Sequence, residues 1–158
     1  MNKNYIKNFY ENVENKILDD VFTLSLPITL IHKIVFNKNE QYIKDKYGLN
    51  HSEIDVLISL YFNNKTQTPT ELYESTIFSS GGMTKVLKKL EQDKYISRSP
   101  DENDKRSMLV ILEKKGDFLA AELLEYFSLE INKIYSILDE EEKEVTKRAL
   151  KKVLYSLS

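Results

Sequence analysis

Small polar residues and lysines are concentrated in one stretch near the middle of the chain. The cations of residues 79–98 outnumber the two anions there, although the whole chain carries a formal charge of −2; they are Lys85, Lys88, Lys89, Lys94 and Arg98. The stretch opens on Ser79, Ser80, Gly81 and Gly82, which are small enough for backbone amides at a helix N-terminus to approach phosphates or bases. Thr84, Lys85 and Lys88 fall away from the apolar face of such a helix. The pattern therefore indicates a DNA-binding helix, with an ordinary serine-capped surface helix as the alternative.

A charged segment follows this helix and separates two short apolar runs. Residues 95–98 and 107–112 have the pattern of strands, and residues 100–105 form a polar turn between them, which predicts a β-hairpin. The candidate contact residues at its tip are Asn103, Asp104, Lys105 and Arg106. A cation at the tip of a hairpin can enter the minor groove, where negative potential is concentrated. A solvated turn with an Asp–Arg pair is the alternative.

Two capped helices must precede and position this segment. Thr68 is a capping residue followed by proline at the first helical position and by Thr70 and Glu71, so a short helix ending near residue 75 is expected. Residues 50–53 have the spacing of a capping box and begin another helix, which fades at residues 63–64. The order of capped helix, short capped helix, turn, basic helix and hairpin predicts a winged helix-turn-helix.

Apolar residues at three- and four-residue spacings predict amphipathic helices at both ends of the chain. The first runs over residues 4–23, and a break is expected at residues 24–26 because Pro27 would clash with the carbonyl of Thr23. A second runs over residues 26–46 and ends at Gly48. Helical spacing resumes after Glu113, and Asp139 caps the last helix. We expect a mostly α-helical fold with a small β-hairpin wing, divided into dimerisation helices (1–48), the winged lobe (49–115) and further dimerisation helices (116–158).

The composition excludes several classes of function. There is no cysteine, which removes disulfides, thiolate metal sites and thiol-based sensing, and with only two histidines no metal site is expected. No phosphate-binding glycine loop, nucleophile–histidine motif or HExxH motif is present, so neither an enzyme nor a cofactor is expected. The most apolar stretch, residues 21–36, is interrupted and shorter than a membrane span. The polar N-terminus is not a secretion signal, and we expect a cytoplasmic protein.

Residues 68–116 resemble the MarR family of bacterial transcription regulators. The matching pieces are residues 69–72, 79–85 and 89–91, and the sequence Asp101-x-x-Asp104-Lys105-Arg106 with Gly116 ten residues beyond. Residues 49–57 resemble the family's helix before the DNA reader. The resemblance implies a homodimer whose N- and C-terminal helices interlock, with two winged lobes that bind a pseudo-palindromic operator.

The resemblance also implies roles for individual residues. It places Ser80, Gly82, Thr84, Lys85 and Lys88 or Lys89 at recognition-helix positions, puts Thr68 and Thr70 on the helix before them, and has Asp104 and Arg106 stiffen the wing. The family often has arginine where this chain has Lys85 and Asn103. Lysine lacks the planar fork of arginine. We therefore expect DNA reading that depends on phosphates and groove shape more than on arginine forks.

Many members of the family respond to small anionic or phenolic effectors that bind between the dimer helices and the winged lobe. The residues that would line such a pocket here are His32, Phe36, Tyr47 and Tyr61, for which a place in the core or an interface is the alternative. The N-terminal arm before residue 20 is longer than in many members, and we expect it to add dimer contacts. The sequence thus predicts a sequence-specific regulator of transcription that binds double-stranded DNA, acting as a ligand-responsive repressor. A winged helix used only for protein–protein contact is the alternative.

Overall fold

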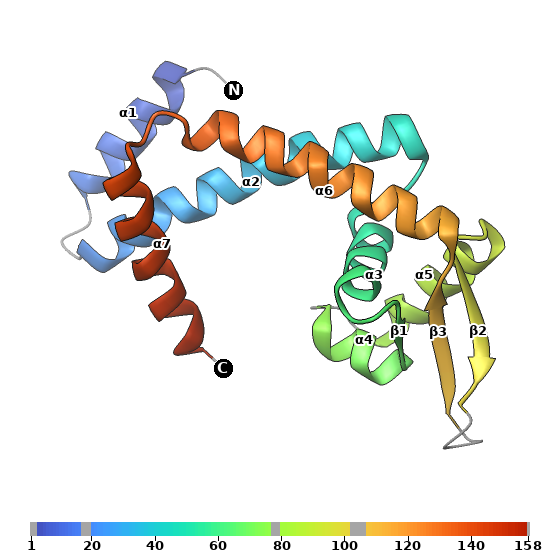
Figure 1. Cartoon of the computed structure of the whole chain (residues 1–158). Coiled ribbons are helices and arrows are strands. Elements are labelled where there is room, and N and C mark those ends of the chain that lie inside the picture. Colours follow the sequence, from blue (N-terminus) through green and yellow to red (C-terminus); the bar gives the residue numbers. More distant parts are fainter. Residues whose placement is uncertain (1–2, 17–19, 77–79, 102–106, 158) are drawn as a thin grey trace. The chain divides into compact units, whose positions relative to one another are not determined.

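The structure, a computed structural model, describes residues 3–16, 20–76, 80–101 and 107–157. Over these residues it contains seven helices and a three-stranded antiparallel sheet (Figure 1). The chain divides into two compact units, Met1–His51 and Ser52–Ser158. The expectation of a mostly helical fold with a small hairpin is confirmed.

Two helices form the first unit, α1 (Lys3–Glu14) and α2 (Asp20–Tyr47). The predicted break before Pro27 is wrong, because α2 continues through the proline. Proline has no N–H to donate to the carbonyl of Thr23, four residues earlier. The hydroxyl of Tyr10 on α1 donates to that carbonyl instead, at 2.9 Å. A neighbouring helix thus replaces the missing backbone bond, which the helical pattern alone does not reveal.

Gly48 ends α2 as expected. Its φ of +64° lies in the left-handed region that glycine adopts without strain, and its N–H donates to the carbonyl of Lys44 at 3.0 Å. Residues 49–50 then lead into α3 (His51–Phe62).

The winged lobe occupies the first part of the second unit. After α3 come β1 (Thr66–Gln67), α4 (Pro69–Ser75), α5 (Ser80–Gln92), β2 (Ile96–Pro100) and β3 (Met108–Leu112). The sheet order is β1-β3-β2, and Thr66 and Ser97 both pair with Ile111 in the central strand. The two-residue β1 was not predicted, because so short a strand has no alternating pattern.

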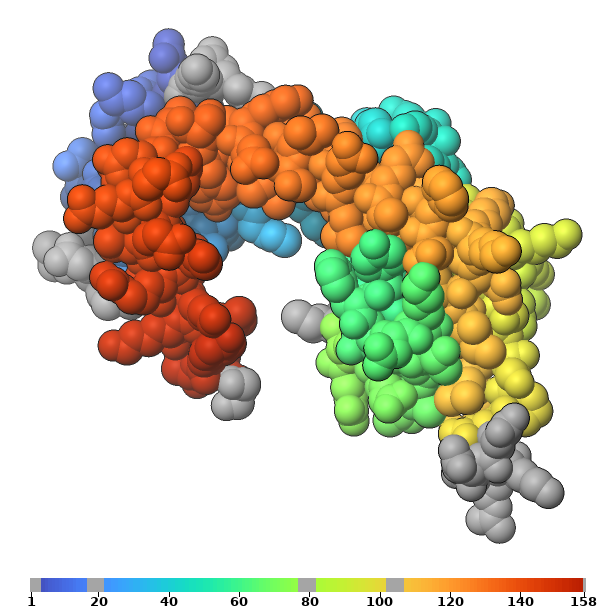
Figure 2. Space-filling view, in the orientation of Figure 1, coloured from blue at the N-terminus to red at the C-terminus, as the bar shows by residue number. Residues whose placement is uncertain are grey.

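The core of this lobe collects aliphatic side chains from all three helices and both longer strands. In the space-filling view, α3 (green) lies beside β3 and the first turns of α6 (orange) (Figure 2). Among the fully buried side chains are Ile54, Val56, Leu57, Leu60, Leu72, Leu90, Ile96 and Val110. Their burial removes apolar surface from water and holds the helices and the hairpin together as one body.

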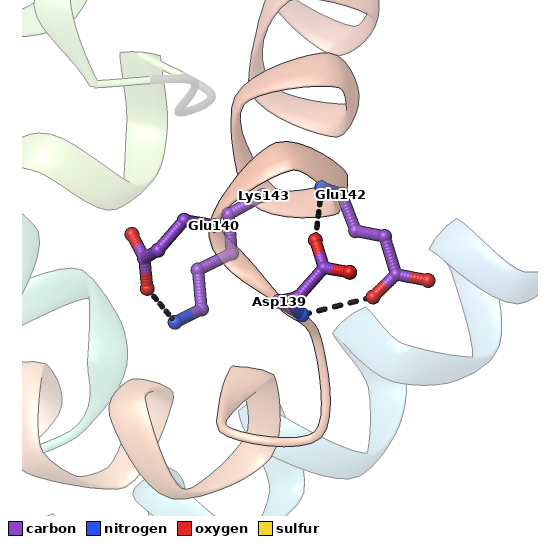
Figure 3. A network of polar contacts seen from close by, with 4 residues as sticks. All are labelled: Asp139, Glu140, Glu142 and Lys143. Carbon is purple, nitrogen blue, oxygen red and sulfur yellow. Dashed lines mark hydrogen bonds and ion pairs between the residues drawn. The ribbon is translucent and has the colours of Figure 1, made fainter.

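Two helices complete the second unit, α6 (Lys114–Tyr135) and α7 (Glu140–Tyr155). The predicted cap of the last helix is confirmed: the Glu142 N–H donates to Asp139 Oδ1 at 2.8 Å, and the Asp139 N–H donates to Glu142 Oε2 at 2.9 Å (Figure 3). Beside it, Lys143 Nζ lies 2.6 Å from Glu140 Oε1. No described side chain of α7 is buried.

None of the helices within the described residues is both long enough and apolar enough to span a membrane.

Candidate nucleic-acid interface

The helix α5 has one buried face and one polar exposed face. Its buried side chains are Met83, Val86, Leu87 and Leu90, and its exposed residues include Gly82, Thr84, Lys85 and Lys88. Ser80, Gly81 and Gly82 make up its first turn. Backbone N–H groups at the start of a helix have no partner within the helix and, with the helix dipole, attract anions. This face therefore has the chemistry to contact a phosphate backbone, whereas Ser79 lies outside the described residues.

The helix before it, α4, begins with the predicted capping box. The hydroxyl of Thr68 accepts from the Glu71 N–H at 3.2 Å, and the Thr68 N–H donates to Glu71 Oε2 at 2.7 Å. The hydroxyl also donates to the same carboxylate oxygen at 2.9 Å. These bonds, first the one from the backbone and then the one from the hydroxyl, lower the pKa of Glu71. Thr68 therefore starts α4, while Thr70 is exposed.

A shallow groove lies between α4 and α5. Its volume is about 290 Å³, and Thr70 and Thr84 line it together with Arg98 of β2. The Arg98 guanidinium is also 3.1 Å from Glu91 on α5. The structure thus brings Thr70 and Thr84, predicted from two different helices, to one surface, and ties the first strand of the hairpin to the reader helix.

The hairpin has the predicted connectivity. Pro100 of β2 pairs with Met108 of β3, and the Asp101 N–H donates to the Ser107 carbonyl at 3.0 Å. The strands span residues 96–100 and 108–112, close to the expected 95–98 and 107–112. The tip residues predicted to contact DNA lie outside the described residues; they are Asn103, Asp104, Lys105 and Arg106.

Gly116, which closes the sequence signature of the wing, lies in the first turn of α6 against the base of the hairpin. A Cβ built there would meet the backbone carbonyl of Tyr95 and would lie 2.7 Å from Leu112 Cδ1. The Glu113 N–H also donates to the Tyr95 carbonyl at 3.0 Å. Only a residue without a side chain lets α6 start this close to the hairpin, which explains why glycine stands at this position.

Lys89 is held differently from the other lysines of α5. Its Nζ lies 3.1 Å from Oε2 of Glu53, a buried residue in the first turn of α3. The spacing of residues 50–53 predicts Glu53 as a capping residue, and its carboxylate also pairs with Lys89. No local pattern links two residues 36 positions apart, so the sequence did not reveal this pair.

The four effector candidates do not lie in one unit. In the first unit, His32 and His51 both contact Phe36: the Phe36 and His51 rings stack at 3.9 Å, and the His32 and Phe36 rings lie 5.6 Å apart. Tyr47 lies edge-on to Tyr42 at 6.2 Å. Tyr61 belongs to the second unit and contacts Phe62 at 5.5 Å.

Two cavities in the first unit lie between α1 and α2 and involve other residues. Their volumes are about 600 and 220 Å³, and both are lined by Ile6, Leu30 and Ile34. The described residues contain no group of three or more potential metal ligands.

Comparison with known proteins gives consistent matches. A family model described as transcriptional regulator SarA/Rot matches residues 38–123. The chain is 32% identical over 108 residues to the HTH-type transcriptional regulator MhqR of Bacillus subtilis, a match that covers 68% of this chain and 74% of MhqR.

Solved structures match over most of the chain. Wild-type MarR of Escherichia coli matches with a TM-score of 0.70 at 23% identity, covering 83% of this chain and 96% of MarR. MepR of Staphylococcus aureus, solved as a complex with DNA, matches with a TM-score of 0.73 at 24% identity, covering 85% of this chain and 98% of MepR. The fold expected from the resemblance is confirmed, and the sequence relatives are transcriptional regulators rather than enzymes.

Proposed function

Because this chain belongs to the SarA/Rot family of transcriptional regulators, we propose that it acts as a homodimer that binds a pseudo-palindromic operator in duplex DNA and represses transcription there. The observation that carries this proposal is the exposed face of α5. That face presents Thr84, Lys85 and Lys88 beside a first turn of small residues. The structural neighbour MepR was solved with DNA bound, which supports a DNA partner for the same fold.

In this proposal each exposed group has a defined contact. The first turn of α5, from Ser80 to Gly82, enters the major groove and donates backbone N–H groups, and Thr84 reaches base edges. Lys85 and Lys88 contact phosphates, and Thr70 contacts the backbone from α4. In the same proposal, Ser79 belongs to the DNA-contacting residues of the recognition helix. The wing residues occupy the adjacent minor groove; they are Asn103, Asp104, Lys105 and Arg106.

The homodimer is supported by apolar side chains that one chain leaves in water. In the first unit these include Leu24, which is 71% exposed, with Phe22, Ile28 and Ile31; in the second they include Ile137, which is 85% exposed, with Leu129, Val153 and Leu154. Apolar surface of this extent marks an interface, and a second copy of the chain is the simplest partner to cover it. Deleting residues 1–18 is then expected to weaken the dimer, and a dimer of unchanged stability would contradict a role for the arm.

The proposal includes a small anionic or phenolic effector that lowers the affinity for DNA. Its candidate contacts are His32, Phe36, Tyr47 and Tyr61. Because its partner is the operator, the protein acts in the cytoplasm.

A binding experiment tests the DNA proposal. Purified protein is titrated into duplexes from its own promoter region, at several salt concentrations. We expect half-sites separated by roughly 10–10.5 base pairs and an affinity that falls steeply with salt, since lysines displace phosphate counterions. Lys85→Ala and Arg106→Ala should weaken binding without unfolding the protein. Lys147→Ala is the control, because Lys147 lies on α7 beside Glu144.

Two outcomes would contradict the proposal. Wild-type affinity in both variants would remove the basis for a reader in α5 and the wing. Failure of the wild-type protein to shift promoter DNA at low salt would favour the alternative of a winged helix that contacts only other proteins.

A further inference from the structure

The ion pair between Glu53 and Lys89 joins the helix before the reader to the reader helix itself. The Glu53 side chain is only 4% exposed and the Lys89 side chain 40%, and the two charged atoms are 3.1 Å apart. Glu53 lies in the first turn of α3 and Lys89 in the last turn of α5. Helix dipoles favour an anion in the first turn of a helix, where Glu53 lies, and a cation in the last turn, where Lys89 lies. The pair is therefore placed where both helices stabilise it.

The surroundings make the pair costly to break. A buried carboxylate that loses its cation retains the desolvation cost without the attraction that offsets it. Rotation of α5 about its axis would separate the two groups, and it would also move Leu87 and Leu90 out of the core. The charge pair and the apolar contacts of Leu87 and Leu90 thus restrict the same rotation, both in the C-terminal half of α5.

Successive residues of a helix are about 100° apart around its axis. The side chains that α5 presents to DNA therefore depend on the angle at which the helix is held about that axis. Lys85 and Lys88 lie on either side of the direction opposite Leu87 and Leu90, and both are exposed. Lys89 lies at the boundary of that face, and its ammonium is directed to Glu53.

We propose that Glu53 and Lys89 are a positioning pair for DNA recognition: they set the orientation of α5, and Lys89 makes no phosphate contact. This inference rests on the DNA binding by α5 proposed above. It divides three neighbouring lysines into two that contact DNA and one that holds the helix in place.

Adjacent lysines allow a matched test. Lys88→Gln and Lys89→Gln remove the same charge one residue apart, and their affinities are measured against salt on the promoter duplex and on an unrelated duplex of equal length. Lys88→Gln should lower the log–log salt slope by about 1.8 on both duplexes, as expected when a homodimer loses one phosphate contact in each subunit. Lys89→Gln should leave the slope as in the wild type. It should reduce the preference for the promoter duplex, which is the ratio of the affinities for the promoter and the unrelated duplex, roughly fivefold, because α5 is no longer held in the orientation that fits the promoter.

Two further variants separate positioning from a general structural role. Lys89→Arg keeps the charge and should keep the wild-type preference, whereas Glu53→Gln should lose it while leaving the salt slope unchanged. The inference is overturned if Lys89→Gln lowers the salt slope as much as Lys88→Gln. It is also overturned if Glu53→Gln and Lys89→Gln both keep the wild-type preference.

Urea unfolding tests the pair without DNA. Lys89→Met should lower the unfolding midpoint more in the wild-type background than in the Glu53→Gln background, where no buried charge is left unpaired. Equal decreases in both backgrounds would show that the two groups do not interact and would overturn the inference. Failure of the wild-type protein to bind either duplex would contradict the proposed function, and this unfolding cycle would still report on the pair.

Discussion

At the scale of single residues, position 116 has no room for any side chain. The Tyr95 carbonyl and Leu112 occupy the space that a Cβ would need, and one of the two obstacles is backbone. Gly116→Ala should therefore destabilise the protein by about 2 kcal/mol or more, since α6 must move away from the hairpin. Ser128→Ala, at an exposed position of the same helix, should change stability by no more than about 0.5 kcal/mol. Urea unfolding of both variants checks this, and equal effects would refute the close approach.

The Thr68–Glu71 capping box predicts a dependence on pH. Hydrogen bonds from the Thr68 N–H and hydroxyl lower the pKa of Glu71 below its ordinary 4.5. Because the pKa of Glu71 is lower in the folded protein than in the unfolded chain, the ionised carboxylate stabilises the fold at any pH above the ordinary pKa. This stabilisation is lost as the pH falls through the lowered pKa of the folded protein. NMR titration of the Glu71 carboxyl should give a pKa below 4.5 in the wild type and one closer to it in Thr68→Ala. An identical pKa in the two proteins would show that the hydroxyl contributes nothing.

At the scale of elements, α1 compensates for a defect in α2. The carbonyl of Thr23 receives a hydrogen bond from Tyr10 because Pro27 cannot supply one. Tyr10→Phe should lower stability by about 1 kcal/mol, measured by urea unfolding at one protein concentration. In the Pro27→Ala background the backbone N–H of residue 27 can make the bond, so the same substitution should have a smaller effect. Equal effects in both backgrounds would mean that Tyr10 stabilises the unit in some other way.

The sequence predicted those elements whose signals are local. The caps at Thr68 and Asp139 and the end of α2 at Gly48 depend on residues a few positions apart, and the structure contains each of them. The pairing of β2 with β3 follows from the polar turn between two consecutive apolar runs, and it is present as well. What it missed depends on distant residues. The Tyr10 bond that carries α2 through Pro27, the short β1 and the Glu53–Lys89 pair have partners at least 13 positions away.

The same distinction applies to the candidate site. Helical spacing alone correctly separated the exposed Thr84, Lys85 and Lys88 from the buried face of α5. The family resemblance, in contrast, left Lys88 and Lys89 as alternatives for one recognition-helix position. Only the position of α3 distinguishes them, and α3 is placed by packing rather than by spacing.

At the scale of the whole molecule, the uncovered apolar residues of α7 predict a measurable effect on assembly. Leu154 is exposed in the single chain. Leu154→Asp would place a charge in the proposed dimer interface and should raise the dimer dissociation constant about tenfold or more. Lys147→Ala, at an exposed position of the same helix, is the control. Sedimentation equilibrium measures both variants, and an unchanged constant for Leu154→Asp would exclude α7 from the interface.

The absence of any buried described side chain in α7 has a consequence for gene control. If the apolar stripe is covered only by pairing, the operator-binding species forms in proportion to the square of the free chain concentration while dimers are scarce. A twofold rise in the free chain concentration then raises the number of competent dimers about fourfold, and tenfold dilution makes assembly less favourable by about 1.4 kcal/mol. In the proposed dimer, the rate at which the cell makes and degrades this chain would therefore affect gene control, with a threshold set by the dimer dissociation constant.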